Sequence, residues 1–159
     1  MNRAASLVGT IVFAFVVPAA VGGWIPWFLP HQAASPTPHW SWLGLVLVAK
    51  GLALFVWCAA GFVRNLGIPL PGAEPAHLVV KGPYRFVRNP MYVAVLTAIA
   101  GWAVFLRSPW IVAYGFAVWL VMTTFVCAYE EPKLRRLFGA EYEAYVAKVP
   151  RWLPRTKPA

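Results

Sequence analysis

The sequence contains no aspartate, and its carboxylates are five glutamates among 159 residues. They are Glu74, Glu130, Glu131, Glu141 and Glu143. Chemistry that needs paired carboxylates therefore has very few possible positions. Charged residues of both signs make up 12% of the chain, whereas soluble domains average about 25%. This shortage of charge, together with 60% hydrophobic residues, argues against an ordinary soluble fold.

Cysteine and histidine are also scarce, and neither is spaced as a metal-binding pattern requires. The two cysteines, Cys58 and Cys127, both lie within apolar runs, as small buried hydrophobic side chains do. The histidines, His31, His39 and His77, show no zinc-like spacing. We therefore expect no metal site and no disulfide framework.

Positive charge is present, with a net charge of +9. The lysines and arginines form short clusters between apolar runs instead of one continuous basic stripe. Such clusters are typical of membrane topology, whereas nucleic-acid binding favours a basic face. We therefore expect a lipid bilayer as a partner and no nucleic acid.

Four apolar segments are candidates for membrane-spanning helices, which need about 20 residues. They cover approximately residues 4–29, 40–63, 91–106 and 109–128. The first is long enough to be a retained span instead of a cleaved signal peptide. The third is short, and the connection LRSPW after it predicts an antiparallel hairpin with the fourth. The expected fold is all-α, a single membrane domain over residues 1–159 with four transmembrane helices.

The distribution of basic residues between the loops predicts the topology. The loop PHQAASPTPH contains no lysine or arginine, whereas the segment 64–90 and the tail after Ala128 contain most of them. The positive-inside rule places that segment and both termini in the cytoplasm. We expect the membrane to be a bacterial inner membrane. Lys50 interrupts the second apolar run and is a candidate functional residue. The alternatives are that the helix is displaced along the membrane normal or that the side chain faces the bundle.

The tail segment EPKLRRLFGAEYEAYVAKV predicts an amphipathic helix at the membrane interface, with Pro132 in its first turn. One face carries Leu134, Phe138, Tyr142, Tyr145 and Val146, and the charged side chains lie largely on the other.

The stretch KGPYRFVRNPMYVAV brings polar residues to the start of the third apolar segment. Gly82 and Pro83 predict a turn, and Pro90 suits the first turn of the helix. Free backbone N–H groups at that helix start, together with the cation of Arg88, predict a cradle for a carboxylate or phosphate. The alternative is that Arg85 and Arg88 contact lipid headgroups.

Glu130 and Glu131 form a second cluster at the end of the fourth apolar segment. Two adjacent carboxylates at this place are unfavourable, because a helix C-terminus prefers cations. Local pairing of Glu131 with Arg135 is one explanation. The other is that the carboxylates bind a cationic ligand. Both clusters lie on the same predicted side of the membrane, where they could together bind one ligand that carries an anionic and a cationic group.

The stretches LVVKGPYRFVRNPMY and EEPKLRRLFGAEYEAY resemble the two signature blocks of the isoprenylcysteine carboxyl methyltransferase and phospholipid methyltransferase superfamily. The blocks read G-x-Y-x-x-x-R-H/N-P-x-Y and E-E-x-x-L-x-x-x-F-G-x-x-Y-x-x-Y, and the resemblance covers residues 77–153. It implies a small helical membrane fold whose cytoplasmic loop and tail enclose S-adenosylmethionine, with a lipophilic substrate. It also implies cofactor contacts at Leu78, Val79, Tyr84, Asn89, Pro90, Met91, Tyr92 and Glu130.

We expect a methyltransferase that acts on a lipid-like or lipid-anchored substrate. A carboxylate acceptor needs no base, whereas Glu131 would be the nearest base for an amine acceptor. Arg88 would supply a fixed cation to the site. The alternatives are N-methylation of a phospholipid amine and a non-enzymatic membrane binding protein. Two positions differ from the prenylcysteine enzymes: Asn89 replaces a histidine, and Val126 replaces an arginine that contacts the substrate. Arg88 and Arg151 are the candidate substitutes for that arginine.

Overall fold

The computed structural model describes residues 16–30, 39–66, 78 and 80–154, and these form helices and connecting turns without a strand. The prediction of an all-α fold is confirmed for them. The helices are α2 (Ile25–Phe28), α3 (Leu43–Leu66), α4 (Pro90–Leu106), α5 (Pro109–Phe125) and α6 (Glu131–Lys148). Short 3₁₀ turns, His39–Trp42 and Gly82–Arg85, precede α3 and α4, and π-helical turns cover Ala20–Trp24 and Val126–Glu130.

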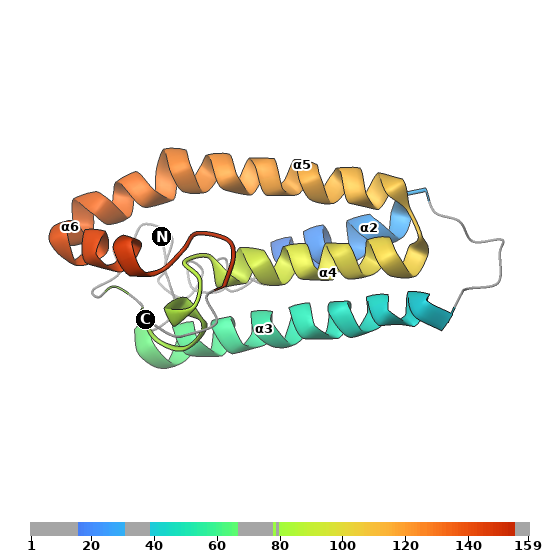
Figure 1. The fold of residues 1–159 in the computed structure, drawn as a ribbon, viewed down its shortest axis with the longest axis horizontal. Coiled ribbons are helices and arrows are strands. Elements are labelled where there is room, and N and C mark those ends of the chain that lie inside the picture. Colours follow the sequence, from blue (N-terminus) through green and yellow to red (C-terminus); the bar gives the residue numbers. More distant parts are fainter. Residues whose placement is uncertain (1–15, 31–38, 67–77, 79, 155–159) are drawn as a thin grey trace, which may run out of the picture.

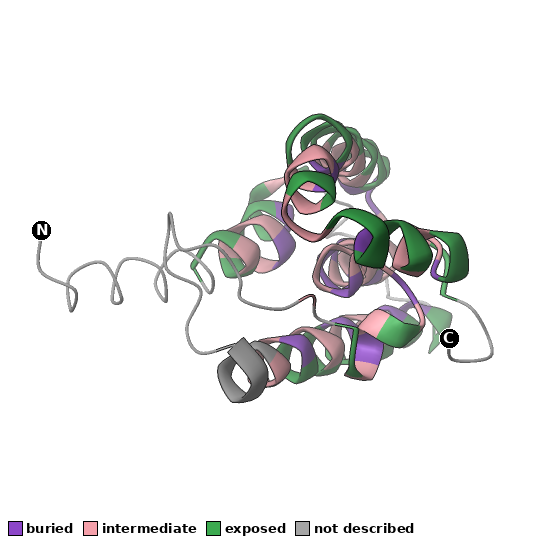
Figure 2. Cartoon of the chain, turned by 90° about the vertical axis from the view of Figure 1, so that its left-hand side faces the viewer, coloured by how far each residue is buried: buried purple, intermediate pink, exposed green. Residues whose placement is uncertain are grey.

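Helix α4 lies at the centre of the bundle, between α3 and α5, and α2 packs against it (Figures 1 and 2). Its side chains Val95, Ile99 and Leu106 form the buried core together with Ile111 of α5. Because α4 is covered on several sides, the residues just before it are held at one end of the bundle.

Helices α3 and α4 approach closely because glycines face each other across their contact. A Cβ atom on Gly44 would lie 2.5 Å from the carbonyl oxygen of Gly101, and one on Gly101 would lie 2.6 Å from that of Gly44. A Cβ atom on Gly51 would lie 2.6 Å from the carbonyl oxygen of Ala94. Small residues allow such backbone contact between membrane helices.

The predicted hairpin between the third and fourth apolar segments is confirmed. Only Arg107 and Ser108 separate α4 from α5, and Arg107 adopts a left-handed conformation with φ of 51°. Ser108 caps α5 by accepting a hydrogen bond from the Ile111 N–H at 3.3 Å. Its hydroxyl also donates to the Pro30 carbonyl, which ties the hairpin to the chain after α2.

Two helices are long and apolar enough to cross a membrane, His39–Gly61 and Pro109–Lys148. Two shorter apolar helices, Val16–Phe28 and Pro90–Leu106, complete the bundle. The structure therefore contains four apolar helical segments where four were predicted, two of which meet the length for a full span. The beginning of the first predicted span lies outside the described residues.

The chain continues from α5 through the π-helical turn into α6 without leaving the helical path. The apolar character ends before Glu130, because charged residues follow at short intervals from that point. Gly139 then breaks α6 with φ of 47° and ψ of −121°, and the chain returns toward the start of α4 (Figure 1). The predicted tail helix is confirmed, including Pro132 in its first turn, but it is bent. Its Tyr142 is buried, so this apolar face packs against protein.

Lys50 lies on the exposed side of α3, which excludes the alternative that it faces the bundle interior. The neighbouring Gly51 packs against Ala94 and Ala98, about one to two helical turns after the start of α4 at Pro90. A functional role and a displaced helix stay the two predictions for Lys50.

Candidate functional site

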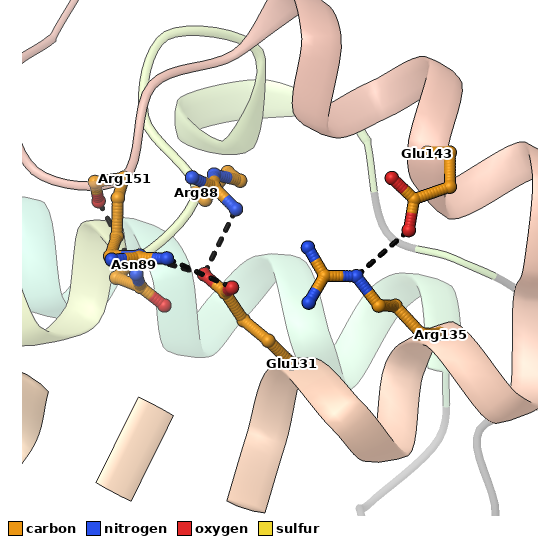
Figure 3. Close-up of polar contacts among 6 residues, drawn as sticks. All are labelled: Arg88, Asn89, Glu131, Arg135, Glu143 and Arg151. Carbon is orange, nitrogen blue, oxygen red and sulfur yellow. Dashed lines mark hydrogen bonds and ion pairs between the residues drawn. The ribbon is translucent and has the colours of Figure 1, made fainter. Parts of the chain in front are cut away.

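The two polar clusters predicted from the sequence meet around the carboxylate of Glu131 (Figure 3). Arg88, just before α4, donates from Nη1 to Oε1 at 2.9 Å. Arg151, in the tail after α6, donates from Nε to Oε1 at 2.7 Å and from Nη2 to Oε2 at 2.9 Å. Glu131 is only 5% exposed, so this carboxylate is desolvated and held by two guanidinium groups.

Arg88 is also largely buried, with 12% of its side chain exposed. Its Nε atom is buried and has no hydrogen-bond partner within the described part of the chain. A buried guanidinium donor without a partner is suited to bind an anionic group.

The tail is fastened over the start of α4 by backbone as well as side-chain contacts. The Arg88 N–H donates to the Pro150 carbonyl at 2.9 Å, and Asn89 Nδ2 donates to the Arg151 carbonyl at 3.3 Å. The rings of Tyr92 and Trp152 lie 6.4 Å apart. The hydrogen bond to Glu131 raises the pKa of the Arg151 guanidinium, which therefore stays charged. We call residues 149–152 the tail strap.

Glu130 takes a different partner from its neighbour. It accepts a hydrogen bond from the Tyr92 hydroxyl at 2.6 Å, the one polar partner it has among the described residues. Burial raises the pKa of the Glu130 carboxyl; the Tyr92 hydrogen bond opposes this effect and the adjacent Glu131 adds to it. Arg88 lies just before α4 and Tyr92 lies in its first turn, so they meet the two adjacent carboxylates at the end of the π-helical turn. Single π-helical turns are frequent at functional sites.

The turn before α4 forms a further wall of the site. The Tyr145 hydroxyl of α6 donates to the Tyr84 carbonyl at 2.8 Å, which holds the returning half of α6 against this turn. Burial raises the pKa of the Tyr84 hydroxyl well above its usual range, so this group stays neutral. Gly82 has φ of 61°, which fits the predicted turn, and Pro83 beside it is buried.

Most of the residues predicted from the sequence lie together at this end of the bundle. They are Tyr84, Arg88, Asn89, Pro90, Met91, Tyr92, Glu130 and Glu131. Leu78 is partly buried, whereas Val79 lies outside the described residues. Of the two explanations for the adjacent carboxylates, local pairing of Glu131 with Arg135 is not found: Arg135 donates to Glu143 at 2.8 Å (Figure 3).

The sequence gives little indication that the tail strap belongs to the site. It predicts Arg151 only as one of two possible substitutes for the cation missing at Val126, and Asn89 only as a cofactor contact. The signal available in the sequence was the short run VPRW directly after the amphipathic helix. Among the described residues, no group of three or more histidine, cysteine or acidic side chains could hold a metal ion.

Comparison with known proteins gives the family. The model of the family described as "Phospholipid methyltransferase" matches residues 39–141. The chain belongs to the phospholipid methyltransferase family. The match to this family includes both clusters around Glu131 and ends before the tail strap. The resemblance of the two sequence blocks is thereby confirmed.

Several proteins similar to this chain are named protein-S-isoprenylcysteine O-methyltransferase. A rice protein named "Probable protein-S-isoprenylcysteine O-methyltransferase" (Oryza sativa subsp. indica) is 32% identical over 72% of this chain and 61% of its own length. The mouse protein-S-isoprenylcysteine O-methyltransferase (Mus musculus) is 30% identical over 87% of this chain and 51% of its own. The chain thus spans between about half and three fifths of these relatives. No solved structure matches it.

Proposed function

We propose that this chain is an integral-membrane enzyme that transfers a methyl group from S-adenosylmethionine to a lipid-like or lipid-anchored acceptor. One observation carries the proposal: Arg88 and Tyr92 of the first block meet Glu131 and Glu130 of the second, across 43 and 38 residues of sequence. The names of the relatives, which are O-methyltransferases, support the same reaction.

The side chains present fit the charge distribution of S-adenosylmethionine. Glu130 is partly buried and can accept further hydrogen bonds, from an ammonium or from ribose hydroxyls. The unpartnered Nε of Arg88 suits a carboxylate. When bound, S-adenosylmethionine supplies an activated methyl carbon. Met91, Tyr92 and Tyr84 provide apolar and aromatic surface beside these groups.

The contribution of the protein to such a reaction is alignment and exclusion of water. Holding reactants in line can lower a barrier by up to roughly 7–11 kcal/mol. The tail strap and the returning half of α6 cover the start of α4, and this cover would exclude water from the acceptor.

The geometry also bears on the role of Glu131. Both of its oxygens accept hydrogen bonds from guanidinium groups. We propose that it mainly holds Arg88 and Arg151 in position. This arrangement favours an acceptor that needs no base, such as a carboxylate; the role of Glu131 as a base belongs to the alternative in which the acceptor is an amine. With a carboxylate acceptor, Arg88 would act as the fixed cation beside it.

Membrane placement is part of the proposal. The two long apolar helices bury few of their residues, and Val112, Phe116 and Val121 of α5 are exposed. We propose a single membrane domain over residues 1–159 with both termini in the cytoplasm of a bacterium. Labelling of single cysteines placed in residues 32–38 tests this topology. Reaction of these cysteines with an impermeant reagent from the cytoplasmic side would contradict it.

Methyl transfer is tested in two steps on the purified chain in detergent. Calorimetry should first detect binding of S-adenosylmethionine; absence of binding by the folded chain would contradict the proposal. Radioactive methyl transfer to bilayer lipids and apolar acceptors should then give a product. A label released by mild base is a methyl ester, whereas a stable label is an N-methyl group. Binding without any product from this panel would favour the non-enzymatic alternative.

A further inference from the structure

A second cationic feature lies on the opposite side of the helix from Glu131. Tyr129 and Lys133 are each two positions from Glu131, and Arg136 is five positions away. At about 100° per residue these spacings put all three side chains roughly opposite the carboxylate. Glu131 is buried toward the site, while Tyr129 and Arg136 are exposed, as this arrangement requires.

These side chains border a hollow of about 310 Å³. Its described lining consists of Ala128, Tyr129, Lys133, Arg136 and Leu137, and it includes no carboxylate. Neither Lys133 nor Arg136 takes part in the ion pairs found among the described residues, which use Arg88, Arg135 and Arg151. The hollow therefore combines two positive charges, which form no ion pair among the described residues, with a phenol hydroxyl that can donate a hydrogen bond.

An apolar stripe leads directly to this hollow. Val121, Phe125 and Tyr129 follow one another at intervals of four residues, and all three are exposed. The rings of Phe125 and Tyr129 stack with their centroids 5.2 Å apart. A helix that passes from the acyl chains of a bilayer to its headgroups carries apolar side chains first, then an aromatic ring, then cations. The stripe and the hollow follow this order.

We infer that the hollow binds the phosphate group of an anionic phospholipid in the leaflet at this end of the bundle. Lys133 and Arg136 would neutralise the phosphate, Tyr129 would donate a hydrogen bond to it, and one acyl chain would lie along Phe125 and Val121. The excess of positive charge explains a preference for anionic over zwitterionic lipids. This lipid would not be the methyl acceptor, because the helix separates it from Arg88 and Glu131.

The inference depends on the proposed membrane placement but not on methyl transfer. If an alkaline carbonate wash released the chain from vesicles, both the membrane placement and the lipid site would be contradicted. Calorimetry with S-adenosylmethionine reports separately on the site around Glu131, so failure of one proposal is distinguishable from failure of the other.

The test is a titration of the delipidated full chain in detergent with phosphatidylglycerol or phosphatidylcholine, followed by native mass spectrometry. The variant Lys133→Ala/Arg136→Ala should bind phosphatidylglycerol at least about tenfold more weakly than the wild type, since each cation near an anionic surface adds to the affinity. The matched control Arg135→Ala/Lys148→Ala removes the same charge from other exposed positions and should bind like the wild type. The charge-preserving variant Lys133→Arg/Arg136→Lys should also retain binding, which excludes a simple folding defect.

Three outcomes would overturn the inference. One is equal affinity of the wild type for the two lipids, and another is an equal loss in the two alanine variants, which would indicate only bulk charge. The third is displacement of bound phosphatidylglycerol by millimolar glycerol phosphate, which would indicate a site for a soluble phosphate instead of a lipid.

Discussion

Glu131 and Arg151 are joined by two hydrogen bonds, Nε to Oε1 at 2.7 Å and Nη2 to Oε2 at 2.9 Å, across 20 residues of sequence. An arginine fork that meets both oxygens of a carboxylate gives directional as well as electrostatic binding. The pair fixes the tail strap over the residues that we propose to hold the cofactor. Substitution of either residue should therefore change how firmly the tail strap is held.

Replacing Arg151 with alanine should loosen the tail strap. About one third of the Arg151 side chain is exposed, so we expect a loss of about 1–2 kcal/mol in the free energy of unfolding, below the figure for a fully buried pair. Hydrogen exchange of residues 149–152 should become faster, and Arg151→Lys should restore protection only in part. Arg135→Ala is the control, because its pair with Glu143 is exposed. Equal exchange in Arg151→Ala and the wild type would contradict this role.

Glu130 should make cofactor affinity depend on pH. Burial raises the pKa of its carboxyl above the ordinary value, and only the ionised form attracts a cationic group. Affinity for S-adenosylmethionine should therefore be complete above this raised pKa and fall as the pH decreases through it, at a higher pH than an ordinary carboxyl would give. Glu130→Gln should bind more weakly, by about 1.5–3 kcal/mol, and should lose this dependence. Calorimetry at pH values above the pKa of about 4.3 of free glutamate, up to about 8, would measure this dependence. If the variant and the wild type had the same pH profile, a group other than the Glu130 carboxyl would be responsible for the pH dependence.

A larger residue at Gly51 should separate α3 from α4. A Cβ atom there would lie 2.6 Å from the Ala94 carbonyl oxygen and 2.9 Å from the Ala98 nitrogen, which are backbone atoms that cannot rotate away. Gly51→Leu should destabilise the chain by about 3 kcal/mol or more, the upper range for overpacking. Thermal unfolding followed by circular dichroism in detergent measures this. Gly23→Leu is the matched control, because no atom lies within 4 Å of a Cβ at that position. Similar midpoints for the two variants would show that the close helix contact is not needed.

The bend in α6 should depend on glycine at position 139. A Cβ atom there would meet nothing within 4 Å, so the requirement comes from the backbone, with φ of 47° and ψ of −121°. L-residues adopt this conformation at a cost of about 1–3 kcal/mol. Gly139→Ala should therefore weaken the docking of residues 140–148, seen as faster hydrogen exchange there, while the neighbouring Ala140→Ser should not. Unchanged protection in Gly139→Ala would mean that α6 has another way to bend.

Val126 should limit the use of prenylcysteine acceptors. The prenylcysteine enzymes are expected to use an arginine at this position, but Val126 is buried in the π-helical turn and offers no cation. In a panel of lipid amines and other small apolar acceptors, we expect at least one compound to be methylated better than a farnesylcysteine analogue. Any methylation of that analogue should require Arg88 or Arg151, whose guanidinium groups both lie at Glu131. Efficient turnover that survives Arg88→Ala/Arg151→Ala would show that the missing arginine does not determine the acceptor.

The sequence by itself determined the properties that depend on neighbours along the chain. The apolar runs predicted four helical segments, and Pro90, Pro109 and Pro132 each lie in the first turn of a helix, where a missing N–H has no cost. The tight connection at Arg107 and Ser108 predicted the hairpin. The two blocks around Arg88 and Glu131 could be identified from their internal spacing, because each is a continuous stretch.

Only the tertiary structure decided which charged groups meet. Arg135, four residues from Glu131, was the partner that helical spacing allowed, but Arg88 and Arg151 occupy that carboxylate, while Tyr92 takes Glu130. Pairings across 20 to 43 residues depend on how α4, α5 and the tail cross, and local spacing contains no information about that crossing. The same holds for the contact of Gly44 with Gly101 and for the exposed side on which Lys50 lies. A single glycine at position 139 redirects the tail because its backbone conformation, not its side chain, determines where the tail strap arrives.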